Sequence, residues 1–166
     1  MSTPENVCSR RVFMVGATAA GLAAVLAAGL PTAAADTSTD AIKMTCVLRR
    51  RADLTPEQFH DYWLNHHGPF AAEQIKILGG YRYVQSHILD SPQNALLAAT
   101  RGTGEPYDGI VEVWFPSAQA MLAGLATPDG IQANQRLADD EKNFIDLPRS
   151  SYFLTTEHVM LGEPRP

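Results

Sequence analysis

One short stretch of the chain gathers side chains that can move protons and bind aromatic molecules. Between Leu54 and Pro69 the sequence reads LTPEQFHDYWLNHHGP, which includes a tyrosine, a tryptophan and three histidines. The ordinary pKa of histidine lies near neutral pH, so a histidine can accept a proton and return it under working conditions. Neighbouring aromatic side chains offer flat apolar surfaces to a substrate ring. The stretch therefore predicts a small-molecule site with a histidine as general base.

The residues that flank this stretch predict a helix that carries it. Thr55 is a suitable N-cap, Pro56 fits the first helical position, and Gln58 completes a capping box. Gly68 and Pro69 predict its end. Helical spacing places four side chains on one face: Phe59, Tyr62, Trp63 and His66.

The three histidines have different expected roles. His67 is the candidate general base or hydrogen-bond donor; the alternative is a helix-terminal histidine that donates to free carbonyls and favours the negative end of the helix dipole. His66 is a candidate substrate contact, with a packed or partly exposed side chain as the alternative. His60 is expected at the surface.

Alternating and helical patterns after residue 41 predict the rest of the architecture. Strands are expected at 42–49, 81–89, 109–115 and 152–160, and helices at 55–67, 70–78, 118–125 and 131–144. Residues 90–108 form a long loop, in which 95–99 can form a turn of helix. The order strand, helix, strand, strand, helix, strand predicts an α+β, ferredoxin-like βαββαβ fold with helices on one face of an antiparallel sheet.

The sheet face without helices is expected to carry a second set of functional side chains. Glu112 alternates with Ile110 and Trp114, and a desolvated carboxylate there would be a candidate base; the alternative is an ion pair with a strand charge such as Arg82. Aromatic and imidazole side chains are expected to line the same cavity or to pack in a dimer interface: Tyr81, Tyr83, His87 and Trp114. An uncovered apolar face favours a two-fold homodimer.

The first 35 residues resemble a targeting segment of the twin-arginine type. Ser9-Arg10-Arg11-Val12-Phe13 precedes a mild apolar run that reaches Leu30, and Ala33-Ala34-Ala35 offers a cleavage site. We expect residues 1–35 to be a signal peptide, 36–41 a leader and 42–161 the folded domain, exported to the periplasm or secreted through the twin-arginine machinery. A plain secretory signal and an uncleaved anchor are the alternatives.

Composition and motifs also limit the functional classes. The net charge of −5, without a basic stripe, argues against nucleic-acid binding. We find no glycine-rich phosphate loop and no nucleophile elbow, so no nicotinamide or flavin site is expected. His60, His66 and His67 do not have the spacing of a metal site, and no metal is predicted. The three arginines 49–51 predict a solvated strand end, with an anion contact as the alternative.

Several of these segments resemble the EthD-domain family, named for ethyl tert-butyl ether degradation. The similarity lies in KMTCVLRR (43–50), LTPEQFHDYW (54–63) and HGP (67–69), and more weakly in 109–115, 143–146 and the last strand with Glu157. The resemblance implies a dimeric α+β barrel and a small-molecule oxidoreductase, and the family motif falls on Trp63 and His67, with Tyr62 beside them. Similar barrels include cofactor-free oxygenases of anthrones, and cyclases or dehydratases of polyketide-like substrates.

The combined hypothesis is an exported, homodimeric, cofactor-independent oxygenase for a small hydrophobic or aromatic compound. His67 and Glu112 are its expected catalytic residues, and its expected pocket residues are Tyr62, Trp63, His66, Tyr81, Tyr83, His87 and Trp114. The alternatives are a dehydratase or cyclase, a haem-binding barrel, and a ligand-binding protein without catalysis. A haem is suggested by related barrels and by the suitability of twin-arginine export for preloaded cofactors.

Overall fold

The structure, a computed structural model, describes residues 41–162. In chain order its elements are β1 (Ile42–Leu48), α2 (Pro56–Asp61), the π-helix η1 (Tyr62–His67), α3 (Gly68–Ile77), β2 (Arg82–His87), α4 (Gln93–Arg101), β3 (Gly109–Phe115), α5 (Ala118–Ala126), α6 (Pro128–Glu141), the 3₁₀ turn η2 (Leu147–Arg149) and β4 (Ser151–Thr155). The predicted signal peptide and most of the leader lie outside the described residues. Within them, no helix is long and apolar enough to cross a membrane.

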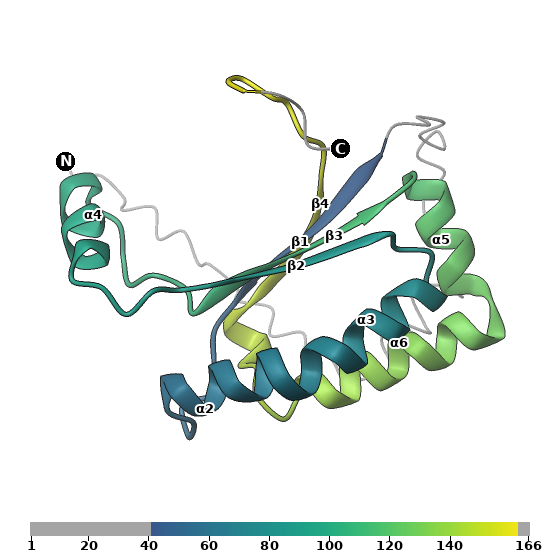
Figure 1. Cartoon of the computed structure of the whole chain (residues 1–166), viewed down its shortest axis with the longest axis horizontal. Coiled ribbons are helices and arrows are strands. Elements are labelled where there is room, and N and C mark those ends of the chain that lie inside the picture. The colour runs from purple at the N-terminus through teal and green to yellow at the C-terminus, as the bar shows by residue number, and fades with distance from the viewer. Residues whose placement is uncertain (1–40, 163–166) are drawn as a thin grey trace, which may run out of the picture. The chain divides into compact units, whose positions relative to one another are not determined.

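The four strands form one antiparallel sheet in the order β2-β3-β1-β4. Helices α3 and α6 lie along one face of this sheet (Figure 1). The element order and strand order together confirm the predicted ferredoxin-like α+β fold. The central strands β1 and β3 are the first and third strands in sequence. After β1 the chain therefore passes through the helices to the edge strand β2, and β3 then pairs with both β1 and β2.

Strand alternation divides the sheet into a helix-covered face and an open face. On the helix-covered face, Cys46, Val113 and Phe115 are buried, and they pack with the fully buried rings of Phe59 and Phe144. The open face carries the alternate residues of the same strands. Apart from the buried Trp114, its apolar members remain partly exposed, for example Ile110 at 39% and Phe153 at 47%. The single core of the domain therefore lies between the sheet and its helices.

The helix start at Thr55 is as predicted, but the predicted end at Gly68-Pro69 is wrong. The Thr55 hydroxyl accepts from the Gln58 N–H, and the Gln58 side chain accepts from the Thr55 N–H, which closes the capping box. The helix then widens into η1 and continues as α3, with Pro69 in the first turn of α3. The π turns interrupt the regular hydrogen-bond ladder, so Pro69 is accommodated where its missing N–H is not required.

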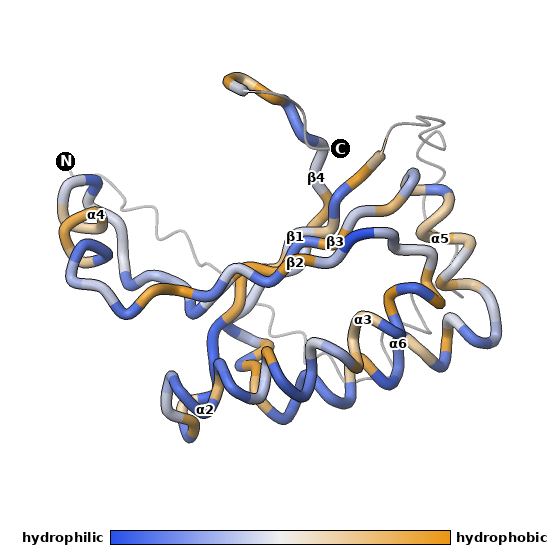
Figure 2. The backbone as a smooth tube through the Cα atoms, viewed as in Figure 1, coloured by the Kyte–Doolittle hydropathy of each residue, from blue (hydrophilic) through white to orange (hydrophobic). Residues whose placement is uncertain are grey.

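Three other boundaries differ from the sequence prediction. Helix α6 begins at Pro128 rather than at residue 131. Thr127 is its N-cap, because the Thr127 hydroxyl accepts from the Gly130 N–H. The long loop contains a nine-residue helix, α4. The last strand ends at Thr155 rather than at residue 160. Apolar residues on α4 and in the stretch 159–161 remain exposed, and both segments appear in Figure 2 with hydrophobic colouring.

The prediction that arginines 49–51 form a solvated strand end fits Arg51, whose side chain is 42% exposed, but not Arg49, at 15%. Arg49 donates to the backbone carbonyls of residues 105 and 106 and stacks 4.4 Å from the Tyr107 ring. Arg50 pairs with Asp108 at 3.2 Å, and Arg51 pairs with Asp53 and donates to the carbonyl of residue 142. The guanidinium groups therefore fasten the loop before β3 and the end of α6 to the end of β1.

Candidate functional site

The π-helix η1 carries most of the chemistry that the sequence predicts. The Gly68 N–H donates to the Trp63 carbonyl, five residues back, and the Gln85 side chain donates to the same carbonyl at 3.1 Å. A β-carbon on Gly68 would lie 3.1 Å from the Gln85 amide nitrogen, so a glycine lets the two approach. π turns inside helices are frequent at functional sites. Here the wider turn brings Trp63 against the sheet and His67 against α6.

His67 and Asp140 form a buried hydrogen-bonded pair between η1 and α6. The His67 Nδ1 lies 2.7 Å from the Asp140 Oδ2, and His67 is only 5% exposed. The other carboxylate oxygen accepts from the Tyr62 hydroxyl at 2.8 Å, and Asn143 donates to that hydroxyl at 3.1 Å. Both oxygens of Asp140 are thus occupied by groups of the helix layer, which fixes the orientation of the imidazole.

The arrangement defines the state of the imidazole. A carboxylate only accepts, so a neutral His67 carries its hydrogen on Nδ1 and leaves the lone pair on Nε2. Burial lowers the pKa of His67, while the hydrogen bond and charge of Asp140 oppose that effect. The imidazole is therefore kept in the form that can accept a proton, and the carboxylate stabilises the cation that results.

Trp63 is the centre of a second network, which faces the sheet. Its fully buried ring stacks on His87 with 4.1 Å between ring centroids and an interplanar angle of 11°. Gln85 accepts from the His87 ring at 2.9 Å and donates to the Tyr83 hydroxyl at 2.7 Å. Burial raises the pKa of Tyr83 to about 12, so its hydroxyl stays protonated at neutral pH. This network lies in the interior between η1 and β2.

Glu141 is a third group with chemical potential, and sequence reasoning missed it. It follows Asp140 in α6 and accepts a hydrogen bond from Tyr152 of β4, near Cys46 and Tyr83. Burial raises the pKa of Glu141 to about 7, although the Tyr152 hydrogen bond opposes the shift. The available signal was an acidic pair in the last turn of α6; its partner Tyr152 is distant in sequence and comes from another element.

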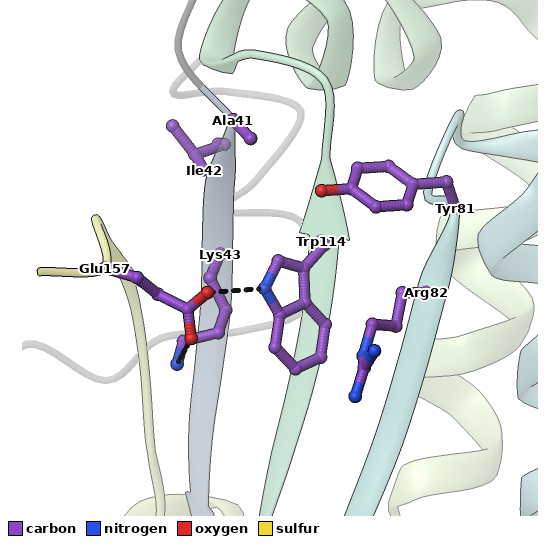
Figure 3. Close-up of a pocket in the computed structure, with 7 residues that line it drawn as sticks. All are labelled: Ala41, Ile42, Lys43, Tyr81, Arg82, Trp114 and Glu157. Carbon is purple, nitrogen blue, oxygen red and sulfur yellow. Dashed lines mark hydrogen bonds and ion pairs between the residues drawn. The ribbon is translucent and has the colours of Figure 1, made fainter. Parts of the chain in front are cut away.

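The open face holds a separate group of charged and aromatic residues. Lys43 lies 2.6 Å from Glu112 and 3.1 Å from Glu157, and Glu157 accepts from the Trp114 indole at 3.2 Å. Figure 3 shows Lys43, Glu157 and Trp114 at a hollow, which we name the open-face hollow. The volume of this hollow is about 220 Å³. Its walls combine apolar and charged side chains, and its lining residues are Ala41, Ile42, Lys43, Tyr81, Arg82, Trp114 and Glu157.

The predicted site residues therefore fall into two groups on opposite faces of the sheet. The expectation that Tyr83 and His87 share a cavity with Glu112 and Trp114 is wrong. Arg82 lies opposite Trp114 in the β2–β3 register, so Tyr83 and His87 face the helices. Glu112 lies on the open face of the sheet, opposite to the helices, and has the ion pair that was its alternative, with Lys43 as partner.

The remaining predicted residues are placed as follows. Tyr81 lines the open-face hollow with Trp114, as expected. The His66 side chain is 65% exposed and lies 4.0 Å from Asp61, away from the His67 pair. His60 is half-buried rather than at the surface, with its ring 4.9 Å from that of His87. Across residues 41–162 the structure has no group of three or more histidine, cysteine or acidic side chains arranged for a metal ion.

Comparison with known proteins gives matches across most of the described chain. A family model described as EthD domain matches residues 51–148. The chain is 27% identical over 108 residues to the dehydratase UstZ of Ustilaginoidea virens, covering 63% of this chain and 75% of that protein. Similar solved structures include an ethyl tert-butyl ether degradation family protein of Bacillus halodurans C-125, with 15% identity, a TM-score of 0.49, and coverage of 71% of this chain and 99% of that one.

A further similar structure is that of an oxygenase. It is SnoaB of Streptomyces nogalater, a cofactor-independent oxygenase, with 15% identity and a TM-score of 0.45. The match covers 75% of this chain and 99% of that one.

Proposed function

Because the chain belongs to the EthD-domain family, we propose that it is a cofactor-independent enzyme that moves a proton on a small hydrophobic or aromatic molecule. The observation that carries this proposal is the buried His67–Asp140 pair, with 2.7 Å between Nδ1 and Oδ2. Its supports are the π-helix that presents it and the Tyr62 hydroxyl on the other oxygen of Asp140. These are the parts that general-base catalysis by histidine requires.

The proton moves to the Nε2 atom of His67 in this proposal. Asp140 holds the imidazole by Nδ1, so Nε2 presents its lone pair to a C–H or O–H group of the substrate. When the proton arrives, the ring becomes an imidazolium and the Asp140 carboxylate stabilises its charge. Tyr62 and Asn143 keep that carboxylate in place by hydrogen bonds. The Phe144 ring, 4.8 Å from the imidazole, supplies an apolar contact.

Dehydration is the finer reaction that we propose first. His67 would take a proton from a carbon next to a carbonyl, the electron pair would form a carbon–carbon double bond, and the neighbouring hydroxyl would leave as water after receiving a proton from an acid. Its support is the 27% identity to a dehydratase over 108 residues. Glu141, with a pKa raised by burial to about 7, is a carboxylic acid next in sequence to Asp140 that suits the second proton transfer.

Oxygenation is the second candidate, and it begins with the same proton transfer. The carbanion of an electron-rich aromatic substrate would reduce molecular oxygen and form a carbon-bound peroxide, which takes up the proton held by His67. Loss of the second hydrogen from the same carbon then forms a carbonyl group as the oxygen–oxygen bond breaks and water leaves. Its support is the set of aromatic rings beside His67, which includes Tyr62 on the Asp140 carboxylate and Phe144 and Phe70 with ring centroids 4.8 and 6.4 Å away. Rings of this kind favour an aromatic substrate.

The test is turnover of a panel of hydroxylated aromatic ketones by the protein and by matched variants. We expect H67Q and D140N to lose at least about 100-fold in turnover, the usual contribution of a general base. D139N is the control, because Asp139 is the neighbouring residue and pairs with exposed Lys142 instead. Activity that survives without oxygen supports dehydration, whereas activity that needs oxygen supports oxygenation. Full turnover in both H67Q and D140N would exclude the His67 site.

Export and dimerisation belong to the same proposal. We infer that residues 1–35 direct folded protein through the twin-arginine route to the periplasm or the medium, and this inference rests on the sequence pattern. We also infer a homodimer whose two open faces pack together. The absorbance spectrum of protein from the exported fraction tests the haem alternative. A Soret band would show bound haem and would contradict the cofactor-independent mechanism.

A further inference from the structure

The open-face hollow differs in chemistry from the rest of the open face. It lies at one end of the sheet, where β1 and β2 begin and β3 ends. Figure 3 shows the Trp114 ring between Glu157 and Arg82, with Tyr81 beside it. The hollow measures about 220 Å³, below the usual range of roughly 300–1,000 Å³ for drug-sized ligands. It therefore suits a molecule with one ring rather than several.

Most charges in the hollow are already matched. The Lys43 ammonium lies between Glu112 and Glu157, at 2.6 and 3.1 Å. The second oxygen of Glu157 accepts from the Trp114 indole. The side chains of Lys43 and Glu112 are 14% and 21% exposed, so this ion pair is partly shielded from water, whereas Glu157 is 43% exposed. The one cation among these residues, Lys43, is therefore already paired with two carboxylates.

Arg82 is the exception in the hollow. Its guanidinium lies over the Trp114 ring, 4.8 Å from the centroid, and it has no ion pair or hydrogen bond with another described residue. Its Nε atom is buried without a partner. A buried donor without a partner costs free energy, and a guanidinium presents a planar fork that matches a carboxylate. Among the described residues that line the hollow, Arg82 is therefore the cation without an anionic partner, and its guanidinium is the group that could receive one.

We propose that the open-face hollow binds a small aromatic carboxylate, with Arg82 as its counter-ion. The carboxylate would accept from the Arg82 fork, and the ring would contact Ile42 and Tyr81. Tyr81 is 58% exposed, so its ring is available for such a contact. The hollow lies on the opposite face of the sheet from His67, and this site is independent of the proposed catalytic one.

Calorimetric titration of the full chain with benzoate tests the proposal, and benzamide is the uncharged comparison. We expect benzoate to bind and benzamide to bind at least about tenfold more weakly, because a charge-assisted hydrogen bond contributes roughly 1.5–3 kcal/mol. R82Q should weaken benzoate binding by at least the same factor. The control R136Q removes an exposed arginine of α6 and should leave binding unchanged.

The proposal has clear failure outcomes. It is overturned if benzoate does not bind, if benzamide binds equally well, or if R82Q binds benzoate like the unmodified protein. H67Q should retain benzoate binding. If H67Q does not bind benzoate, the binding site lies in the helix layer and not in the open-face hollow. If R82Q does not fold, the comparison of benzoate with benzamide on the unmodified protein decides the question alone.

Discussion

Two adjacent acidic residues at the end of α6 differ in what they contact. Asp140 faces η1 and holds His67 and Tyr62 with its two oxygens. Glu141 faces the sheet and meets Tyr152, Cys46 and Tyr83 in a buried environment. The carboxylate of Asp140 is surrounded by donors, whereas that of Glu141 has one donor and much apolar surface. Two neighbouring carboxyl groups therefore have different environments: that of Asp140 is held by hydrogen bonds, and that of Glu141 has a pKa that burial raises to about 7.

The raised pKa of Glu141 makes folding stability depend on pH. In the unfolded chain its pKa is about 4.5, and in the fold it is about 7, so the folded state binds more protons between these values. The free energy of unfolding therefore falls as pH rises through this window, by at most about 3 kcal/mol from this group. E141Q removes the effect, so its stability relative to the unmodified protein should increase from pH 5 to pH 8. Urea unfolding at several pH values measures it.

A matched control separates this effect from general electrostatics. D139N removes an acidic side chain from the same helix turn, but ion pairing with Lys142 lowers the pKa of Asp139, which titrates below the window. Its stability curve should run parallel to that of the unmodified protein from pH 5 to pH 8. If E141Q also runs parallel, Glu141 is not a proton-exchanging group in the fold.

At the level of single residues, the sequence predicted the site residues of the helix 55–67 but not the residues that they contact. His67, Trp63 and Tyr62 were predictable because they share one short stretch with helical spacing. Asp140 and Tyr152 were not, because each contacts its partner only after the chain has folded back over ten or more intervening residues. An acidic residue in a polar helix such as α6 has no local feature that distinguishes it from a solvent-exposed one.

The π-helix is the element that organises the interior, and β3 is shaped to receive it. The Trp63 ring lies against Gly109, the first residue of β3, and stacks on His87 from β2. A β-carbon on Gly109 would lie 2.4 and 2.6 Å from atoms of the Trp63 ring and 2.8 Å from the Ser86 carbonyl. Only glycine leaves room for an indole at this point of the strand.

Replacing Gly109 should therefore displace the π-helix from the sheet. We expect G109A to destabilise the fold by about 1–3 kcal/mol, the usual cost of overpacking a core. The control is G104A in the loop before β3, where a β-carbon meets nothing within 4 Å and the backbone φ is not positive. Its stability should stay within about 0.5 kcal/mol of the unmodified protein. Equal thermal and urea stability of the two variants would contradict the role given to Gly109.

Element types were more predictable from sequence than the relation between elements. Strand alternation located all four strands, and the Thr55 capping box located the start of the helix. The continuation through Gly68-Pro69 was not predictable, because glycine and proline usually end a helix and the π turn depends on Gln85 from β2. The face of β2 was also wrongly assigned, since a shift of one residue in strand register exchanges the two faces.

At the scale of the whole molecule, the proposed acid–base groups lie on one side of the sheet, and the face that no helix covers lies on the other. The His67 pair and Glu141 lie on the helix side. The open face has partly exposed apolar side chains in the middle of the sheet, including Ile110 and Phe153, with the charged hollow at its end. An apolar sheet face of this kind is typical of an interface. In a dimer with a two-fold axis, the open face of each copy would cover the open face of the other.

A charge placed in the middle of the open face should therefore separate the proposed dimer. Ile110 lies on the central strand β3, opposite Val47 and Ser86, and is 39% exposed. I110K should reduce the native mass from two chains to one, because a lysine opposed by its symmetry copy is costly to bury.

L64K is the control for this prediction. Leu64 is 56% exposed on η1, in the helix layer, so the L64K variant should remain a dimer. Light scattering after size-exclusion chromatography gives the masses, and circular dichroism confirms that both variants are folded. A dimer that survives in folded I110K would show that the two copies meet through another surface, and a one-chain mass for the unmodified protein would leave the open face to a different partner.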